Sequence, residues 1–356
     1  MHKRVEALRR AMETEGLPYL LVTGSHNRRY LSGFTGTTGV LLIGMREAYL
    51  LTDFRYLEQV RVECPDFNVL RVERSWVERL AQALDELDVR VLGFEGEHLT
   101  YQQYSALKET AGQTELRPTR GMVESLREIK DEEEIAVVRK AVSLVDDVFE
   151  LLTALAPGRQ EREVAVEIEY RMRLAGASGT SFEIIVASGE RSAMPHGVAS
   201  EKVMREGELV VVDCGCVYQG YCSDFTRTVL LGREPEPWQT EIYDIVLKAQ
   251  LAAINAIRPG ATCAEVDAAA RDIISGYGYG EYFGHSTGHG LGLEIHESPR
   301  LSANEQRTLA AGNVVTVEPG IYLPGRGGVR IEDVVVVREH GAEVLTRTPK
   351  QNLVLL

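Results

Sequence analysis

Hydrophobic residues in the first 120 or so positions follow two alternating periodicities. Short apolar runs bounded by turn residues predict β-strands, whereas apolar positions three or four residues apart predict helices. The residues 44–47, between two apolar runs, are typical of a hairpin turn. We therefore expect an α/β layer with a mixed sheet. The predicted strands cover residues 20–22, 40–43, 48–51 and 89–94. The predicted helices cover the amphipathic first segment, which ends at Gly16, and about 56–63, 76–86 and 100–110.

The rest of the chain predicts a second unit that begins with long helices. Proline and glycine interrupt the periodicity at residues 117–122, which we interpret as a domain boundary. The chain is accordingly divided into residues 1–122 and 123–356. Strand-like runs lie between the later helices and dominate the end of the sequence. The predicted helices of this unit cover residues 130–155, about 160–174, and regions near 238–257 and 263–275.

The second unit contains a weak internal repeat. In each copy, a glycine stands six residues before an acid and another glycine stands two residues after it, with an apolar strand between. These acids are Asp213 and Glu318, and a tyrosine follows each. A further acid comes next on another strand-like run, Asp224 in the first copy and Glu332 in the second. Two similar halves, each with two carboxylates at strand ends, predict a pseudo-symmetric sheet with a site between the halves.

The four strand-end carboxylates indicate a metal site. A carboxylate at the end of an apolar strand is costly to bury without a cation, a proton or a metal. Oxygen-rich ligation with one imidazole suits Mn, Co or Zn and does not resemble a closed structural zinc site. The glycine-rich run 285–297 offers three imidazoles, His285, His289 and His296. It contains neither a His-Glu-x-x-His helix nor a nucleotide-binding fingerprint, and these patterns alone leave the choice among the histidines open.

Strand geometry predicts which neighbours face the site. With a period of two, Cys214 and Cys216 face away from the preceding acid, so they are interpreted as small core residues rather than thiolate ligands. Arg330 and Glu332 share a face, so we expect the guanidinium to orient that carboxylate. Asp333 should point the other way and be structural.

Composition and charge exclude several classes of protein. The 356 residues, 44% hydrophobic and 26% charged, are typical of an ordinary soluble protein of two domains. The net charge of −14, with no basic stripe, disfavours nucleic-acid binding. No stretch is long and apolar enough to span a membrane, and the N-terminus lacks the apolar core of a secretory signal. Five cysteines cannot all pair and show no disulfide framework, which favours a reducing cytoplasm.

These motifs resemble the Xaa-Pro peptidases, the group of prolidase and aminopeptidase P with the pita-bread catalytic fold. The run 285–297 matches that family's motif at every specified position, and the order Asp, Asp, His, Glu, Glu matches its ligand order. The resemblance covers essentially the whole chain, whereas methionine aminopeptidases usually lack the N-terminal domain. It implies an α/β (α+β) protein, with a creatinase-like mixed-sheet domain over residues 1–122 and a pita-bread domain over residues 123–356.

The resemblance also implies roles for individual residues. Asp213 would bind one metal ion, His289 and Glu318 the other, and Asp224 and Glu332 would bridge both. Glu318 matches the family's general acid/base. Four further residues match active-site positions of the family: His196, His285, His296 and Arg330. Of these, His196 and His296 are expected to stabilise the tetrahedral intermediate and hold the proline-side group.

The implied activity is removal of the residue before proline by a hydroxide shared between two divalent ions, with Mn favoured over Co and Zn. Prolidases cut dipeptides and aminopeptidases P cut longer peptides with the same ligands, and the compact chain favours a prolidase. A non-catalytic pita-bread peptide-binding protein is the alternative from another class, disfavoured because all five ligands are kept. The resemblance implies a homodimer acting on small peptides with proline second. Candidate cations for a dipeptide's carboxylate are Arg28, Arg29, Arg46 and Arg55.

Overall fold

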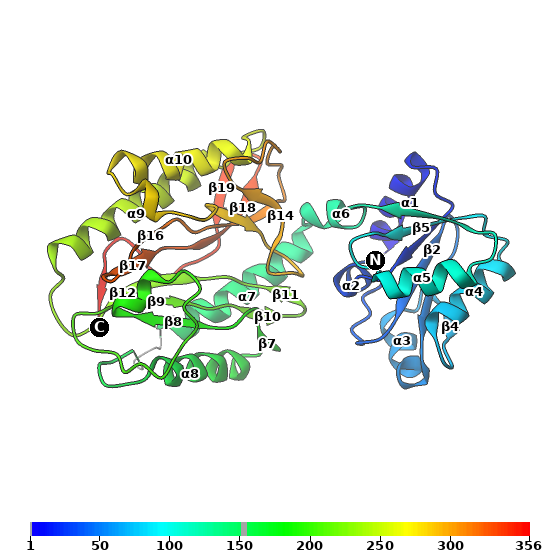
Figure 1. The fold of residues 1–356 in the computed structure, drawn as a ribbon, viewed down its shortest axis with the longest axis horizontal. Coiled ribbons are helices and arrows are strands. Elements are labelled where there is room, and N and C mark those ends of the chain that lie inside the picture. The colour runs from blue at the N-terminus through cyan, green and yellow to red at the C-terminus, as the bar shows by residue number, and fades with distance from the viewer. Residues whose placement is uncertain (1, 151–154) are drawn as a thin grey trace. The chain divides into compact units, whose positions relative to one another are not determined.

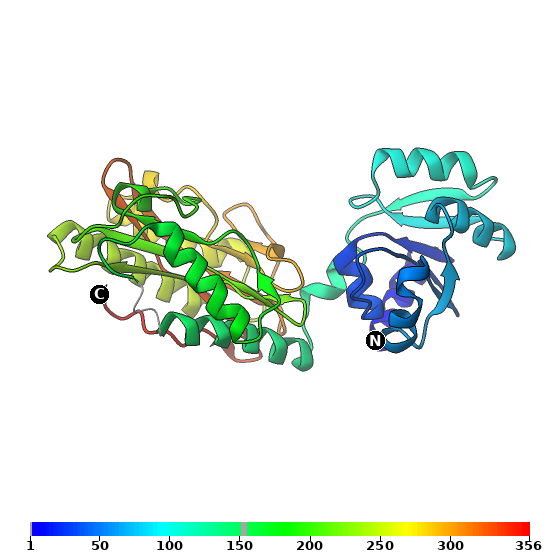
Figure 2. The same cartoon turned by 90° about the horizontal axis from the view of Figure 1, so that it is seen from below.

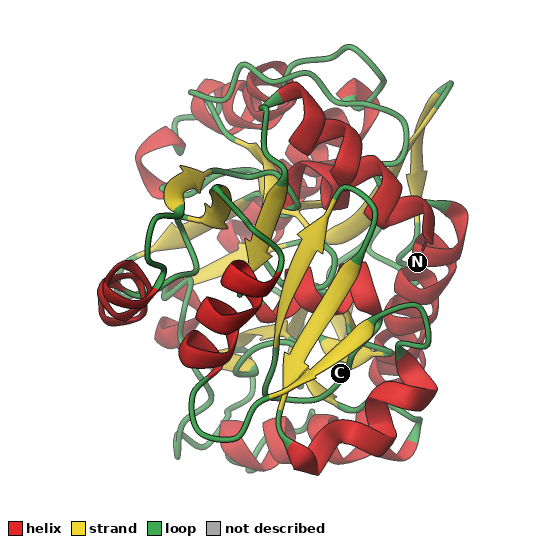
Figure 3. Ribbon diagram, turned by 90° about the vertical axis from the view of Figure 1, so that its right-hand side faces the viewer, coloured by secondary structure: helices red, strands yellow, loops and turns green. Residues whose placement is uncertain are grey.

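The computed structural model describes residues 2–150 and 155–356. They divide into two compact units, Met1–Arg127 and Glu128–Leu356. Both units contain helices and strands, which Figure 3 colours red and yellow. Among the described residues, no helix has the length and apolar character needed to cross a membrane.

The N-terminal unit is built on a six-stranded sheet (Figure 1). Its strand order is β4-β3-β2-β1-β5-β6, and β2 is antiparallel to both neighbours while the other pairs are parallel. The mixed sheet and the β2–β3 hairpin confirm the sequence prediction. The strands are β1 (Tyr19–Val22), β2 (Val40–Gly44), β3 (Ala48–Thr52), β4 (Asn68–Arg71), β5 (Val91–Glu95) and β6 (Glu115–Thr119). The helices are α1 (His2–Thr14), α2 (Ser25–Ser32), η1 (Phe54–Tyr56), α3 (Leu57–Glu63), α4 (Trp76–Glu86), α5 (Tyr101–Thr110) and α6 (Glu124–Glu128).

Four elements of this unit escaped the sequence prediction: α2, α6, β4 and β6. Strands β4 and β6 are the two edges of the sheet and are largely exposed, so they carry little apolar pattern. Pro118 lies in β6, within the segment interpreted as a boundary. Proline is tolerated there because an edge strand leaves some of its N–H positions unpaired.

Two pairs of helices flank the strands of the second unit. Figures 1 and 2 show α7 and α8 on one side of the strands and α9 and α10 on the other. The predicted helices near 160–174, 238–257 and 263–275 are confirmed, whereas residues 151–154 of the first predicted helix lie outside the described residues. The helices are α7 (Glu132–Glu150), α8 (Glu161–Leu174), α9 (Pro237–Ala256) and α10 (Cys263–Gly276), with η2 (Gly189–Ala193) and η3 (Gly280–Tyr282).

The strands of this unit form two similar halves. In each half, a central strand pairs antiparallel with one strand on each side: β9 lies between β8 and β12, and β15 lies between β13 and β18. In the sequence, a hairpin lies between β9 and β12 and another lies between β15 and β18. The hairpins are β10–β11 and β16–β17. The first half comprises β7 (Gly179–Thr180), β8 (Ile185–Ser188), β9 (Leu209–Asp213), β10 (Cys216–Tyr218), β11 (Tyr221–Cys222), β12 (Thr226–Leu230) and the added β20 (Val354–Leu355). The second comprises β13 (Gly288–Gly290), β14 (Glu297–Leu301), β15 (Val314–Val317), β16 (Gly320–Leu323), β17 (Gly327–Arg330), β18 (Asp333–Arg338) and β19 (Gly341–Val344).

Each half has its own hydrophobic core. One core packs α7 and α8 against β8, β9 and β12, and the other packs α9 and α10 against β15, β17 and β18. The halves meet where the N–H of Glu332 donates to the carbonyl of Thr226 at 3.1 Å. The pseudo-symmetric sheet predicted from the repeat is therefore confirmed, and the carboxylates of both halves lie where the halves join.

Candidate metal centre

The five predicted ligands line one cavity of about 690 Å³. Asp213 ends β9, Asp224 precedes β12, His289 lies in β13, Glu318 follows β15, and Glu332 precedes β18. Ligand atoms of Asp224, His289 and Glu332 all lie within 4.8 Å of one another. The Nε2 atom of His289 is 3.5 Å from Asp224 Oδ2 and 3.3 Å from Glu318 Oε1. The structure thus brings together the ligands predicted from both halves of the repeat.

Two oxygen atoms of this cluster have no partner in the part of the chain that the structure describes. Among the described residues, Asp213 Oδ1 and Glu332 Oε1 are buried and receive no hydrogen bond. Buried polar atoms in folded proteins nearly always have a partner, so an orphaned carboxylate oxygen points to a bound cation. Carboxylates with one imidazole are also a donor set that divalent metal ions accept. The residues present therefore fit divalent metal ions.

Burial and mutual repulsion leave the cluster short of positive charge. Burial raises the pKa of Asp213 to about 6 and that of Glu318 to about 7, and the charge of Asp224 adds to both shifts. The same causes raise the pKa of Glu332 well above its ordinary value. Burial lowers the pKa of His289, but its contacts with Asp224 and Glu318 outweigh this and raise it to about 9. Such a site favours bound protons or metal ions.

The two glycines beside His289 lie too close to neighbouring backbone to be replaced by larger residues. A Cβ atom on Gly288 would lie 1.9 Å from the carbonyl oxygen of Thr316, and one on Gly290 would lie 2.3 Å from that of Ser298. The Nδ1 atom of His289 lies 3.0 Å from the carbonyl oxygen of Gly290, to which it can donate. In that tautomer Nε2 keeps its lone pair on the side of the carboxylates, as a metal ligand requires.

Arg330 holds a different carboxylate from the one expected. Its Nη2 donates to Asp213 Oδ2 at 2.5 Å and its Nη1 donates to the Tyr322 hydroxyl at 2.9 Å. It reaches Glu332 only through Thr226, whose Oγ1 accepts from Arg330 Nε at 3.2 Å and donates to Glu332 Oε2 at 2.8 Å. The expected direct pairing with Glu332 was wrong, because β17 ends at Arg330 and strand alternation does not continue to Glu332.

The three other histidines predicted for the site line the same cavity. The His296 ring centroid is 4.4 Å from that of His289, and the rings meet edge to face. His285 Nδ1 donates to the carbonyl of Ser286 at 2.8 Å, and its Nε2 lies 2.9 Å from the hydroxyl of Tyr322. Burial lowers the pKa of His285 to about 4, so this imidazole is neutral and accepts from the tyrosine. His196 completes the set.

Sequence reasoning missed three contributors to this cavity or its network. Tyr322 links His285 to Arg330. The repeat could have indicated it, because a tyrosine follows the first acid in each copy. Thr226 had no signal of its own, since its role depends on a partner 106 residues away. Arg300, on β14, lines the cavity, and its Nε donates to Ser286 Oγ at 3.3 Å.

The residues expected to face away from the site do so. Cys214 and Cys216 lie in the hydrophobic core of the first half, and neither sulfur lines the cavity. All five cysteines are buried and unpaired. Asp333 is buried and binds Arg227 at 2.8 Å and also Lys350, as a structural carboxylate should.

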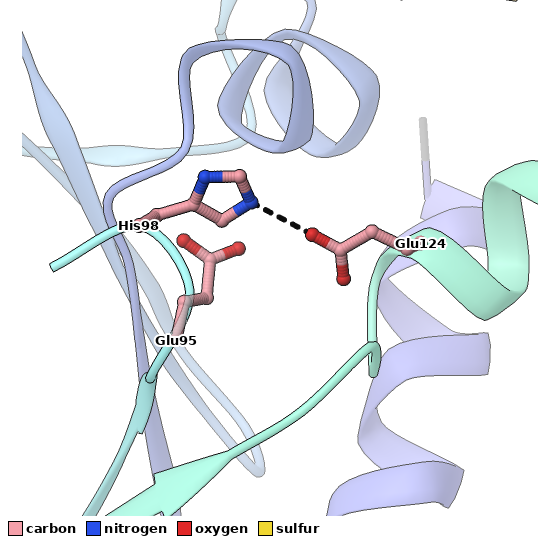
Figure 4. Close-up of side chains that lie close together, drawn as sticks. All are labelled: Glu95, His98 and Glu124. Atoms are coloured by element: carbon pink, nitrogen blue, oxygen red, sulfur yellow. Dashed lines mark hydrogen bonds and ion pairs between the residues drawn. The ribbon is translucent and has the colours of Figure 1, made fainter. Parts of the chain in front are cut away.

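A second group of acids and histidine lies in the N-terminal unit. Ligand atoms of Glu95, His98 and Glu124 also lie within 4.8 Å of one another (Figure 4). Here the amide of Asn27 occupies the centre, with Nδ2 donating to Glu95 Oε1 at 2.6 Å and to Glu124 Oε1 at 2.5 Å. The opposite face of that amide is held by Arg127, which donates to Oδ1 at 2.7 Å. The protein itself satisfies these carboxylates, so they do not fit a metal ion.

Family models assign the class of protein. A model described as Metallopeptidase family M24 matches residues 136–339, and one described as Creatinase/Prolidase N-terminal domain matches residues 4–129. The first spans more than half of the chain, so this chain belongs to metallopeptidase family M24. The resemblance predicted from the sequence, the creatinase-like domain followed by a pita-bread domain, and the assignment as an enzyme are thereby confirmed.

Individual relatives narrow the comparison. A solved Xaa-Pro dipeptidase from Bacillus anthracis is 49% identical, with a TM-score of 0.97 over 100% of this chain and 99% of that one. The Xaa-Pro dipeptidase of Pyrococcus furiosus is 40% identical over 99% of this chain and 100% of its own length. A solved X-Pro aminopeptidase from Thermotoga maritima is 38% identical, with a TM-score of 0.90 over 96% of this chain and 98% of that one.

Proposed function

We propose that this protein is an Xaa-Pro dipeptidase that uses two divalent metal ions. The observation that carries the proposal is the pair of orphaned oxygens, Asp213 Oδ1 and Glu332 Oε1, in a cavity shared with Asp224, His289 and Glu318. Mn is favoured because the donors are mostly carboxylates, with Co or Zn as alternatives. The relatives named Xaa-Pro dipeptidase support the substrate class.

The chain's own residues would bind and orient the substrate and move the proton. When bound, divalent ions polarise a carbonyl and lower the pKa of water. Glu318 would take the proton from the attacking water, because its side chain, 18% exposed, is more open to the cavity than those of Asp213 or Asp224. Arg330 would keep Asp213 ionised and oriented through its hydrogen bond.

The histidines would contact the peptide. His196 and His296 line the cavity and would donate to the oxygen on which charge develops, and they would also hold the proline side. An Xaa-Pro bond has no amide N–H, so this site needs no acceptor for that hydrogen and must fit a rigid ring instead. His285 would orient Tyr322, which in turn binds Arg330.

Arg300 supports the dipeptidase over an enzyme for longer peptides. Its guanidinium lines the cavity and is exposed, so it would bind the free carboxylate of the proline in an Xaa-Pro dipeptide. We prefer it to the N-terminal cations named above because it belongs to the same compact unit as the five ligands. Aminopeptidase P activity is the second candidate, favoured by the similarity to the Thermotoga maritima enzyme.

The test uses the purified full chain loaded with Mn. Hydrolysis of Ala-Pro but not of Ala-Pro-Ala is the expected result, with Arg300→Ala raising KM for the dipeptide at least tenfold. Preferential cleavage of the tripeptide would instead establish aminopeptidase P activity. Binding of either peptide without turnover, under Mn, Co and Zn, would support a non-catalytic peptide-binding protein and contradict the proposal.

We further propose a homodimer in a reducing cytoplasm, and domains over residues 1–122 and 123–356. The five buried, unpaired cysteines support the reducing compartment. Light scattering of the purified protein would measure the mass in solution, and a monomer at assay concentration would contradict the dimer.

A further inference from the structure

One buried side chain binds both ends of the segment that carries His196. Residues 188–200 leave the end of β8, pass through η2 and bring His196 to the cavity wall. Glu161, the first residue of α8, lies behind this segment and is fully buried. A buried carboxylate is retained only where donors surround it.

The contacts of Glu161 are concentrated on the base of the segment. Its Oε1 accepts from the N–H and the Oγ of Ser188, both at 2.8 Å. Its Oε2 accepts from the N–H of Ser200 at 3.1 Å and from its Oγ at 2.6 Å. The same oxygen binds the guanidinium of Arg191, which donates to the carbonyl of Val198 at 2.8 Å. One carboxylate thus fixes where the segment leaves the sheet and where it returns.

The tip of the segment is held from the opposite side. The carbonyl of Pro195 accepts from Arg330 at 3.2 Å, and the Oγ of Ser192 accepts from the N–H of Gly328 at 2.8 Å. His196 therefore lies between a base attached to α8 and a tip attached to β17, the strand that ends at Arg330.

The second half of the sheet repeats this arrangement. Asp267, buried on α10, accepts from the N–H of Thr287 at 3.0 Å and from its Oγ1 at 2.8 Å. It also binds Arg271 at 2.7 Å, and Arg271 donates to the carbonyl of His285 at 2.8 Å. In both halves, a carboxylate on a helix accepts from the N–H and the hydroxyl of a serine or threonine. The same carboxylate also binds an arginine, which donates to a backbone carbonyl in the segment that carries a cavity histidine. In both halves, this arrangement fixes a segment that carries a histidine of the cavity.

We propose that Glu161 is a positioning residue for His196, which sets where the imidazole meets the substrate. The inference rests on the proposed function, since it assumes that His196 contacts the peptide. The competing explanation is that Glu161 only attaches α8 to the sheet. That role would lower stability and leave turnover of the folded enzyme unchanged.

A matched pair of variants separates the two roles. Asp146, on α7, is also fully buried and accepts from the N–H of Thr348 at 3.0 Å, its Oγ1 at 2.6 Å and the N–H of Arg347 at 2.9 Å, outside the cavity. We expect Glu161→Gln and Asp146→Asn to lower Tm by similar amounts with full metal content. Only Glu161→Gln should lower kcat, by about tenfold or more. Wild-type kcat in that variant, or an equal loss in Asp146→Asn, overturns the proposal.

A double-mutant cycle asks whether Glu161 acts through His196. If it does, Glu161→Gln combined with His196→Ala loses no more kcat than His196→Ala alone, within about twofold. Multiplied losses overturn the proposal. Should Glu161→Gln fail to fold, Ser200→Ala removes a single hydroxyl donor, and a smaller loss of kcat that is likewise absent in the His196→Ala background is expected.

Hydrogen exchange provides a readout independent of activity. Amides of residues 188–200 should exchange faster in Glu161→Gln than in Asp146→Asn. Glutamine keeps only one acceptor oxygen, so either the N–H of Ser188 or that of Ser200 loses its acceptor. Equal exchange overturns the proposal whatever the substrate is. A wild-type protein that cleaves no Xaa-Pro peptide contradicts the proposed function instead, so the two failures are distinguishable.

Discussion

The protein contains two groups of acids and histidine with similar distances and different chemistry. In the metal centre, Asp213 and Glu332 each keep a buried oxygen without a partner among the described residues. In the N-terminal cluster of Glu95, His98 and Glu124, the amide of Asn27 fills the space that an ion would need. Ligand-like spacing is common to both. What distinguishes a metal site is the acceptors that the protein leaves unsatisfied.

The largest difference between the two groups should follow removal of their histidines. His289→Ala deletes the only imidazole among the five ligands, so bound metal and turnover should fall at least about a hundredfold. His98→Ala, the matched control, should keep the metal content of the wild type. Elemental analysis of both variants checks this, and a loss of metal in His98→Ala would show that the N-terminal cluster also binds an ion.

Glu318→Gln tests the proton-transfer role apart from metal binding. The amide keeps one oxygen for a metal ion but cannot accept a proton at neutral pH. We expect kcat to fall by about 10²- to 10⁴-fold with part of the metal retained. Kinetics and elemental analysis on the same sample check it, and turnover like that of the wild type would refute the assignment.

Asn27→Ala tests whether the N-terminal cluster is satisfied by its amide. Removal of the amide takes its donor from the buried Oε1 of Glu95, whereas Glu124 Oε1 keeps His98 as a partner. We expect a loss of about 1–3 kcal/mol of unfolding free energy. Gln59→Ala is a control, because the Gln59 amide makes two comparable contacts at the surface; there the loss should stay near about 0.5 kcal/mol. Urea unfolding measures both, and an unchanged stability in Asn27→Ala would contradict this account. Metal content should not change in either variant.

The smallest effect is a pH dependence at Glu124. Burial raises the pKa of this carboxyl, but hydrogen bonds from Asn27 and His98 outweigh it and hold the pKa below its ordinary value. The folded pKa lies below the unfolded one, so the stabilisation is complete above about pH 4.3 and is lost as pH falls through the folded value. Glu124→Gln should therefore lower the free energy of unfolding more at pH 7 than at pH 3, with a difference of less than about 1 kcal/mol. Urea unfolding at both pH values checks this, and an equal cost would contradict it.

The difference between the groups also explains what the sequence could predict. The four carboxylates of the metal centre follow apolar strands at repeated spacings, so their convergence could be inferred from local pattern. Identification of His289 among its neighbours required the family motif. The N-terminal cluster joins Asn27 on α2 to Glu95 at the end of β5 and to Glu124 on α6, and no sequence pattern links these positions. The partner of Arg330 could not be predicted either, because Asp213 lies 117 residues away.

The tight backbone around His289 has a consequence for laboratory evolution of the enzyme. Any side chain at Gly288 or Gly290 would overlap a carbonyl oxygen of a neighbouring strand, so saturation libraries at these positions yield almost only inactive clones. Gly284, one residue before His285, has no atom within 4 Å of an added Cβ. Diversity aimed at altering substrate preference is better placed there, where new side chains can be accommodated without moving the strand that carries His289.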